Sequence, residues 1–213
     1  FNTVLPSIRE ALNLTDTSVG LIATLFNLFY AFMVPLGGWM GDRFSRKWVV
    51  TFSILFWSAA TMFTGIANSV IMLVITRSIA TGGGEAFFGP ANYSLLGQYH
   101  TDTRARAMSI HQTAYYIGVI LAGWLAGFIA DKFDMLHPGE GWKYSFILFG
   151  AAGIVWGLLM AFRLKDKPLS EEEIKSREEN KPGILDGFRT VFTTPTAAFL
   201  TLGFSGLIFV ITG

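Results

Sequence analysis

The sequence contains no cysteine among its 213 residues, and its three histidines, His100, His111 and His137, lie far apart in the chain. The absence of thiols excludes a disulfide framework and thiolate chemistry within this chain, and such scattered histidines provide no ligand set for structural zinc. Charged residues make up only 15% of the chain, and the formal net charge is +1. We therefore expect neither a metal site nor a nucleic-acid partner, because nucleic-acid binding requires a basic surface.

The sequence has long apolar runs instead, and 52% of its residues are hydrophobic. Five runs are long enough to cross a bilayer, at 19–36, 48–66, 70–96, 107–130 and 142–162. Only helices and closed barrels satisfy the backbone inside lipid. Because these runs are continuous rather than alternating, they are predicted to be helices. The predicted fold class is therefore an all-α membrane protein.

The two ends of the chain carry shorter apolar stretches. Residues 1–8 are interpreted as the tail of a first helix and residues 197–212 as the start of another, since a complete span needs about 20 residues. A long polar segment separates the last complete span from the final stretch, and Ser170 is predicted to cap a short helix within it. We therefore expect a transmembrane bundle at 1–163, a cytoplasmic central loop at 164–196 and a partial membrane helix at 197–213.

Lysine and arginine are distributed unevenly over the connections between these runs. Twelve of the sixteen lie in the connections at 37–47, 97–106 and 163–196, and three lie in the opposite connections. Cytoplasmic loops carry the excess of these residues. Counting the tail at 1–8 as the first helix, we predict that loops 2–3, 4–5 and 6–7 are cytoplasmic.

The run at 70–96 differs from the others in length and in charge. Its 27 residues would extend about 40 Å as a helix, against a hydrocarbon core of about 30 Å, so it must tilt or break. The glycines at 82–84 are the predicted weak point. The run also holds Arg77 and Glu85, and charges at this depth are typical of substrate or proton pathways. The alternative is a pair of charges buried for helix assembly.

Four further polar residues are candidates for a solute pathway. His111, Gln112 and Tyr115 can line one side of the run at 107–130. They either line a cavity for a polar substrate or anchor the helix at the membrane interface. Asn27 is a lone polar residue in the run at 19–36, and it is interpreted either as a helix–helix hydrogen bond or as a ligand contact.

The connection at 37–47 reads GGWMGDRFSRK and resembles the loop 2–3 signature of the major facilitator superfamily. The matching residues are Gly38, Gly41, Asp42, Arg43 and Arg46, whereas Ser45 stands where the family pattern has glycine. In that family the loop follows the second of twelve helices and acts as a conformational latch. Its acid engages the start of helix 11 in the outward-open state. The resemblance implies the same role for this loop.

The charged run resembles the R-x-x-x-G-x-G motif of helix 4 in the same superfamily, although Gly82 is five residues after Arg77 instead of four. Residues 82–86, GGGEA, are similar to the spinster-like lipid transporters and the organic anion:cation symporters. In those branches a helix 4 arginine and glutamate are associated with proton coupling and substrate charge. The resemblance therefore implies proton exchange at Glu85 and anion attraction at Arg77.

The resemblance covers the whole chain as the six-helix N-terminal half of a twelve-helix fold, with a truncated helix 1 and the start of helix 7. It implies a secondary active transporter, not an enzyme, working by alternating access between two halves. The expected function is proton-coupled symport of a small organic anion or sugar acid, with the proton gradient in place of a cofactor. Expected partners are an anionic solute, the lipid bilayer and the missing C-terminal half, and the expected location is the plasma (inner) membrane.

Three alternatives stay open at this point. A spinster-like lipid transporter, or another facilitator without proton symport, would fit the same motifs. A seven-helix receptor and an intramembrane enzyme are more remote. A retinal receptor would need a Schiff-base lysine in its last helix, which the run at 197–212 lacks, and no nucleophile accompanies Glu85.

Overall fold

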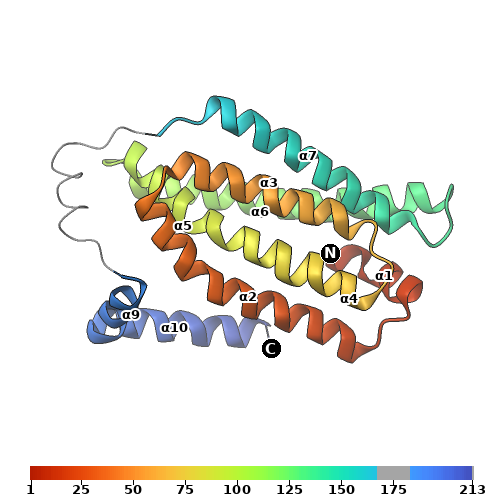
Figure 1. Ribbon diagram of the computed structural model, residues 1–213, viewed down its shortest axis with the longest axis horizontal. Helices are drawn as coiled ribbons and strands as arrows, with labels where there is room; N and C mark the ends of the chain where they lie inside the picture. Colours follow the sequence, from red (N-terminus) through yellow and green to blue (C-terminus); the bar gives the residue numbers. More distant parts are fainter. Residues whose placement is uncertain (167–182, 213) are drawn as a thin grey trace. The chain divides into compact units, whose positions relative to one another are not determined.

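The computed structural model describes residues 1–166 and 183–212, and every regular element in them is helical. The chain divides into two units, at Phe1–Lys167 and Pro168–Gly213. The longer helices of the first unit are α1 (Leu5–Leu12), α2 (Asp16–Arg43), α3 (Arg46–Thr64), α5 (Gly82–Tyr99), α6 (Arg104–Asp134) and α7 (Gly141–Arg163) (Figure 1). The described part of the second unit holds α9 (Ile184–Thr193) and α10 (Pro195–Thr212). The all-α prediction is confirmed, and the helix predicted to begin at Ser170 lies outside the described residues.

Four helices of the described part are long and apolar enough to cross a membrane, at Asp16–Arg43, Val70–Tyr99, Arg104–Asp134 and Gly141–Arg163. The predicted fifth span at 48–66 does form a helix, α3, but α3 is not among these four. α3 begins with two charged residues, Arg46 and Lys47, and three of its hydroxyl-bearing residues, Thr51, Ser53 and Ser58, are buried. The predicted helix is therefore confirmed, and its crossing of the membrane stays a prediction.

The helix at Val70–Tyr99 is continuous but not uniform. It begins as α4 (Val70–Leu73), continues as the π-helical segment η2 (Val74–Thr81) and becomes α-helical again in α5. The predicted break at the glycines is therefore misplaced, because regular α-helix resumes at Gly82 and the irregular turns precede it. Wide π turns are one way in which a helix absorbs an additional residue.

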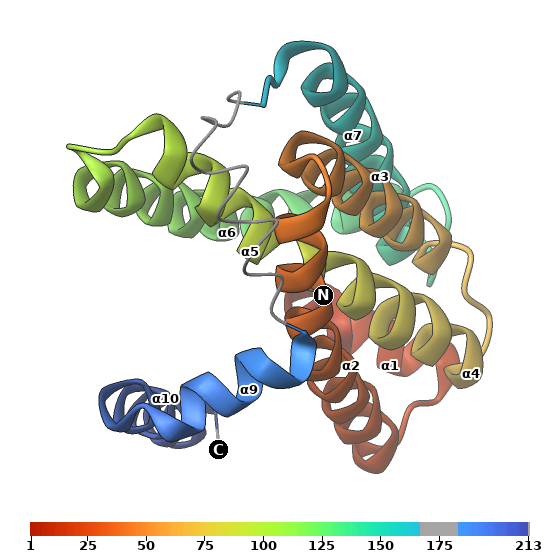
Figure 2. The same cartoon turned by 60° about the vertical axis from the view of Figure 1, so that its left-hand side comes forward.

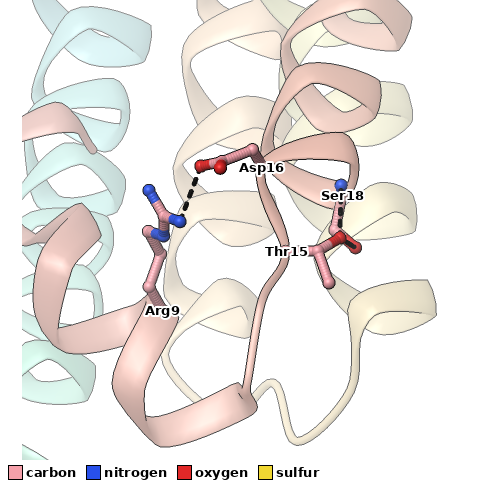
Figure 3. A network of polar contacts seen from close by, with 4 residues as sticks. All are labelled: Arg9, Thr15, Asp16 and Ser18. Carbon is pink, nitrogen blue, oxygen red and sulfur yellow. Dashed lines mark hydrogen bonds and ion pairs between the residues drawn. The ribbon is translucent and has the colours of Figure 1, made fainter.

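The connection between α1 and α2 is held by local polar contacts (Figure 3). Asn13 ends α1 in the left-handed conformation, with φ of 50°. Thr15 caps α2 by accepting a hydrogen bond from the Ser18 backbone N–H. Arg9 and Asp16 form an ion pair of 2.6 Å across the turn. Because both side chains are largely exposed, the pair contributes only about 0.2–1 kcal/mol.

Helices α3 and α7 lie side by side along a stripe of small residues (Figures 1 and 2). A Cβ atom built at Gly150 would lie 2.5 Å from the Met62 Cβ, and one at Gly153 would lie 2.3 Å from the Ser58 Oγ. Glycine at these positions lets the two backbones approach closely, as in other membrane helix pairs. This seam fixes α7 against the bundle.

Candidate functional site

The Arg77 side chain lies between two aromatic rings. Its guanidinium carbon is 5.3 Å from the centre of the Phe1 ring and 5.4 Å from that of Phe26, on α2. Both distances are typical of cation–π contacts. A guanidinium stacks on an aromatic ring through its planar face, so the N–H groups at its edges stay available for other partners. Among the described residues, the ion pairs are Arg9–Asp16 and Lys143–Glu140, so Arg77 has no carboxylate partner there.

Glu85 lies in the first turn of α5, where that helix is wedged between α2 and α3. Gly82 lies against Phe26 of α2, and Gly84 lies against Trp57 of α3, in both cases too closely for a side chain to fit without displacement. Glu85 is half-buried and close enough to Arg77 to interact electrostatically, without an ion pair. The close packing therefore holds the carboxylate at a defined depth in the bundle while its side chain stays partly accessible.

Polar side chains of α5 and α6 meet beyond Glu85. The Asn92 amide nitrogen is 3.2 Å from the His111 Nε2. The Tyr93 hydroxyl donates a hydrogen bond of 3.3 Å to the Gln112 amide oxygen, and the Tyr93 ring packs edge-on against His111 at 5.6 Å. The structure therefore brings two predicted site residues, His111 and Gln112, into one polar cluster with two residues that we did not predict.

Tyr30 lies near this cluster and the charged pair. It lies on α2, in the same region of the bundle as Glu85, Tyr93 and Tyr115. Tyr115 itself is 54% exposed and packs against Tyr116 at 5.4 Å. The structure thus joins His111 and Gln112 by direct contacts to Asn92 and Tyr93, and Arg77, Glu85 and Tyr115 lie in the same region without a hydrogen bond to them.

Sequence reasoning missed Tyr30, Asn92 and Tyr93, although a signal for Asn92 was present. Asn92 follows Glu85 by seven residues, and seven residues complete about two α-helical turns, so both lie on one face of α5. Tyr30 had no comparable signal, because its proximity to Glu85 depends on how α2 crosses α5.

Asn27 does not join the cluster by a hydrogen bond. It is exposed, and its amide donates a hydrogen bond of 3.0 Å to the Ala23 carbonyl of its own helix. The interpretation of Asn27 as a helix–helix hydrogen bond is therefore wrong. Its assignment as a ligand contact stays a prediction.

The loop that matches the family signature joins α2 to α3. Gly41 packs on Ala91 of α5, and the buried Arg46 donates from Nε to the Gly41 carbonyl at 3.3 Å. Gly38 has open space around it. Asp42 and Arg43 are exposed at the end of α2, and the Arg43 guanidinium lies 4.6 Å from the centre of the Trp39 ring. Gly41 and Arg46 thus hold the turn in shape, and the two charges face outward.

Ser45, which departs from the family pattern, has a structural role that we did not predict. Its hydroxyl accepts from the Trp48 backbone N–H at 3.3 Å and donates to the carboxylate of Asp166. Asp166, just after α7, also accepts from the Lys47 backbone N–H at 2.8 Å. A carboxylate at a helix N-terminus satisfies free N–H groups and opposes the positive end of the helix dipole. Asp166 therefore caps α3 from a distant part of the chain.

In the described residues, 1–166 and 183–212, no group of three or more His, Asp or Glu side chains could hold a metal ion. Instead, the cluster offers one cation, one half-buried carboxylate and several neutral donors and acceptors. Such a set suits a polar or anionic solute together with an exchangeable proton.

Comparisons with known proteins show what this chain is similar to. The sequence model described as Major Facilitator Superfamily matches residues 1–213. The chain is 34% identical over 186 residues to "Probable sulfoacetate transporter SauU" of Cupriavidus necator, with 85% of this chain and 41% of that protein covered. It is 28% identical over 211 residues to "Protein spinster homolog 1" of Xenopus laevis, with 97% of this chain and 39% of that protein covered. It is 29% identical over 183 residues to "Hexuronate transporter" of Bacillus subtilis, with 84% of this chain and 41% of that protein covered.

The fold is similar to crystal structures of a bacterial homologue of the human lysosomal transporter Spinster. The inward-facing, unoccupied structure matches with a TM-score of 0.71 at 27% identity, covering 94% of this chain and 46% of the other. The inward-facing, occupied structure matches with a TM-score of 0.69 at 28% identity, covering 81% and 42%. The chain therefore spans less than half the length of the proteins to which it is similar.

Proposed function

The chain belongs to the Major Facilitator Superfamily, and from this membership we propose that it forms the N-terminal half of a secondary active transporter. Its substrate is a small organic anion, which crosses the membrane by alternating access between this half and a second one. In this proposal residues 1–163 form the bundle, 164–196 the cytoplasmic central loop and 197–213 the start of the next helix. The loop containing Asp42 and Arg43 is the conformational latch, facing the cytoplasm of the plasma (inner) membrane.

The observation that carries the proposal is the setting of Arg77. Its charge is held between two rings at mid-helix and has no ion pair among the residues described. A charge inside a membrane helix is costly, at least about 2.5–3.5 kcal/mol by insertion scales, so it marks a substrate or ion pathway by default. A carboxylate, sulfonate or similar group of the solute would supply the missing partner. The printed names of two relatives, a sulfoacetate transporter and a hexuronate transporter, support an anionic solute.

Glu85 is the proposed site of proton coupling. Its carboxylate lies near Arg77 and Tyr30, so its charge state affects the electrostatic field at the Arg77 guanidinium. When Glu85 is protonated, Arg77 is the uncompensated charge and attracts the anion. When the anion leaves, Glu85 can lose its proton and again compensate Arg77. Proton and anion movement are coupled in this way without a cofactor.

The decisive experiment compares Glu85→Gln with Glu10→Gln in full-length protein reconstituted into proteoliposomes. The probes are radiolabelled sulfoacetate and glucuronate, with and without an inward proton gradient. We expect Glu85→Gln to abolish the stimulation by the gradient while anion exchange at equal pH continues. Glu10 lies exposed on α1, so its substitution should leave both activities unchanged.

Two results would oppose the proposal. If gradient-driven uptake survives Glu85→Gln, this residue does not couple protons. If neither anion is taken up by the wild type but a labelled lysolipid is, the lipid transporter suggested by the spinster-like resemblance replaces the anion symporter.

A further inference from the structure

The π-helical segment η2 is the one stretch of the described membrane helices with this geometry, and Arg77 lies in the middle of it. The segment covers eight residues. π-Helix is rare and occurs mostly as single turns inside α-helices, frequently at functional sites. α-Helix flanks it on both sides, as α4 before Val74 and as α5 from Gly82. The chain thus leaves the α-helical register and returns to it around a charged residue.

This geometry changes the direction in which Arg77 projects relative to Glu85. In a continuous α-helix the eight steps between them would leave them about 80° apart. A π turn is closed by an i→i+5 hydrogen bond and accommodates one additional residue, so the eight steps advance about as far as seven α-helical steps, about 700°. This leaves Glu85 within about 20° of Arg77. The π segment therefore places both charged residues on one face of the helix.

Two buried hydroxyl groups stabilise the segment. The Ser78 hydroxyl donates a hydrogen bond of 2.7 Å to the Ile22 carbonyl of α2, and Ser78 is fully buried. The Thr81 hydroxyl donates to the Thr76 carbonyl, five residues earlier, at 2.8 Å. Ser78, the residue directly after Arg77, is thus hydrogen-bonded to α2. The same helix carries Phe26, one of the two rings beside the guanidinium.

We propose that η2 accommodates one additional residue in this membrane helix, that it turns Arg77 onto the face of Glu85, and that Ser78 is a positioning residue for Arg77. The role of Arg77 in transport rests on the proposed function, whereas its orientation does not. The extra residue between Arg77 and Gly82, relative to the family spacing, lies within this segment. A helix without it would reach the same alignment with ordinary α-helical turns.

The first test is a pair of single-residue deletions in the full-length protein. Ile79 lies in η2 with its side chain partly exposed, and Ser94 lies in the regular α-helix of α5. Deleting Ile79 should convert η2 to α-helix while keeping both flanks in register, so folding and transport persist. Deleting Ser94 should rotate the rest of α5 by about 100° and abolish folding. Equal damage from the two deletions, measured as monodisperse yield and Tm in detergent, would overturn the proposal.

The second test measures the orientation of position 77 without requiring transport. Because this chain has no cysteine, Arg77→Cys introduces a single thiol whose reaction with a methanethiosulfonate reagent can be timed, once any thiols elsewhere in the full-length protein are replaced. Adding Ser78→Ala should accelerate labelling by about two- to thirteenfold, since one buried hydrogen bond contributes about 0.5–1.5 kcal/mol. The matched control is Ser53→Ala, which removes a buried hydroxyl bonded within its own helix.

The two tests separate this inference from the proposed function. An unchanged labelling rate in the Ser78→Ala background would show that Ser78 does not position residue 77. If the deletions and the labelling behave as expected but Glu85→Gln leaves gradient-driven uptake intact, only the proton-coupling proposal fails.

Discussion

Two regions of the bundle differ in packing, polarity and exposure. One is the seam between α3 and α7, and the other is the polar cluster along α2, α5 and α6. At the seam, glycines of α7 lie directly on α3, and there is no space for an added methyl group at Gly150 or Gly153. In the cluster, the contacts pass through polar side chains, such as the 3.2 Å contact between Asn92 and His111. Tyr93 and Tyr115 are 40% and 54% exposed there.

We infer from this difference that one region supports the structure of the bundle and the other takes part in transport. Close-packed interiors tolerate little change in volume, so the seam acts as a rigid support. Half-exposed polar groups in a membrane protein are retained where a solute or a proton needs them. Substitutions at the seam should therefore change stability, and substitutions in the cluster should change transport.

The largest expected effect is that of Gly150→Leu at the seam. Its Cβ would lie 2.5 Å from both the Cβ and the backbone nitrogen of Met62, so α3 and α7 must separate. Overpacking of this kind costs about 1–3 kcal/mol, and we expect Tm in detergent to fall by about 2–12 °C. Gly118→Leu is the control, because nothing lies within 4 Å of Gly118. Equal losses of Tm in both variants would contradict the role of the seam.

A smaller effect, on transport instead of stability, is expected for Arg77→Lys. The charge is kept, but an ammonium lacks the planar surface that stacks between Phe1 and Phe26. We expect KM for the anion to rise about tenfold, because the free energy of the cation–π contacts that position the charge is lost. Tm should stay near the wild-type value. A fall in Tm as large as that of Gly150→Leu would remove the distinction between the two regions.

The smallest effect is expected outside both regions, for Glu140→Gln between α6 and α7. A hydrogen bond from Lys143, together with its charge, lowers the pKa of the exposed Glu140 below its ordinary value of 4.5. Its contribution to stability is therefore present above pH 4.5 and disappears as the pH falls below it. Wild type and variant should differ in Tm by about one degree or less at pH 7 and not at pH 3. A gap that widens on acidification would have the wrong sign.

Much of the fold could be predicted from the sequence because apolar length and periodicity are local properties. The helices form where the apolar runs predicted them, and Gly41, Arg46 and His111 lie in structured polar or packed surroundings. The expected break at 82–84 was misplaced because it was inferred from the length of the run and the position of the glycines, and neither property indicates where a π turn forms.

Contacts between distant parts of the chain could not be predicted in the same way. The hydrogen bond between Ser45 and Asp166 joins residues 121 positions apart, and no pattern in either segment indicates it. The proximity of Tyr30 to Glu85 also depends on how two helices cross. For α3, hydropathy alone could not show that protein covers Thr51 and Ser53.

The cap that Asp166 places on α3 also fixes the position of the backbone that follows α7. The backbone after α7 is pinned at Asp166 by two hydrogen bonds, and the Tyr99 hydroxyl donates a third to the Lys165 carbonyl at 2.9 Å. Residues 164–166, which would span about 10 Å if extended, are thereby held against the bundle. Movement of the end of α7 would therefore act first on the turn between α2 and α3, which carries the signature loop.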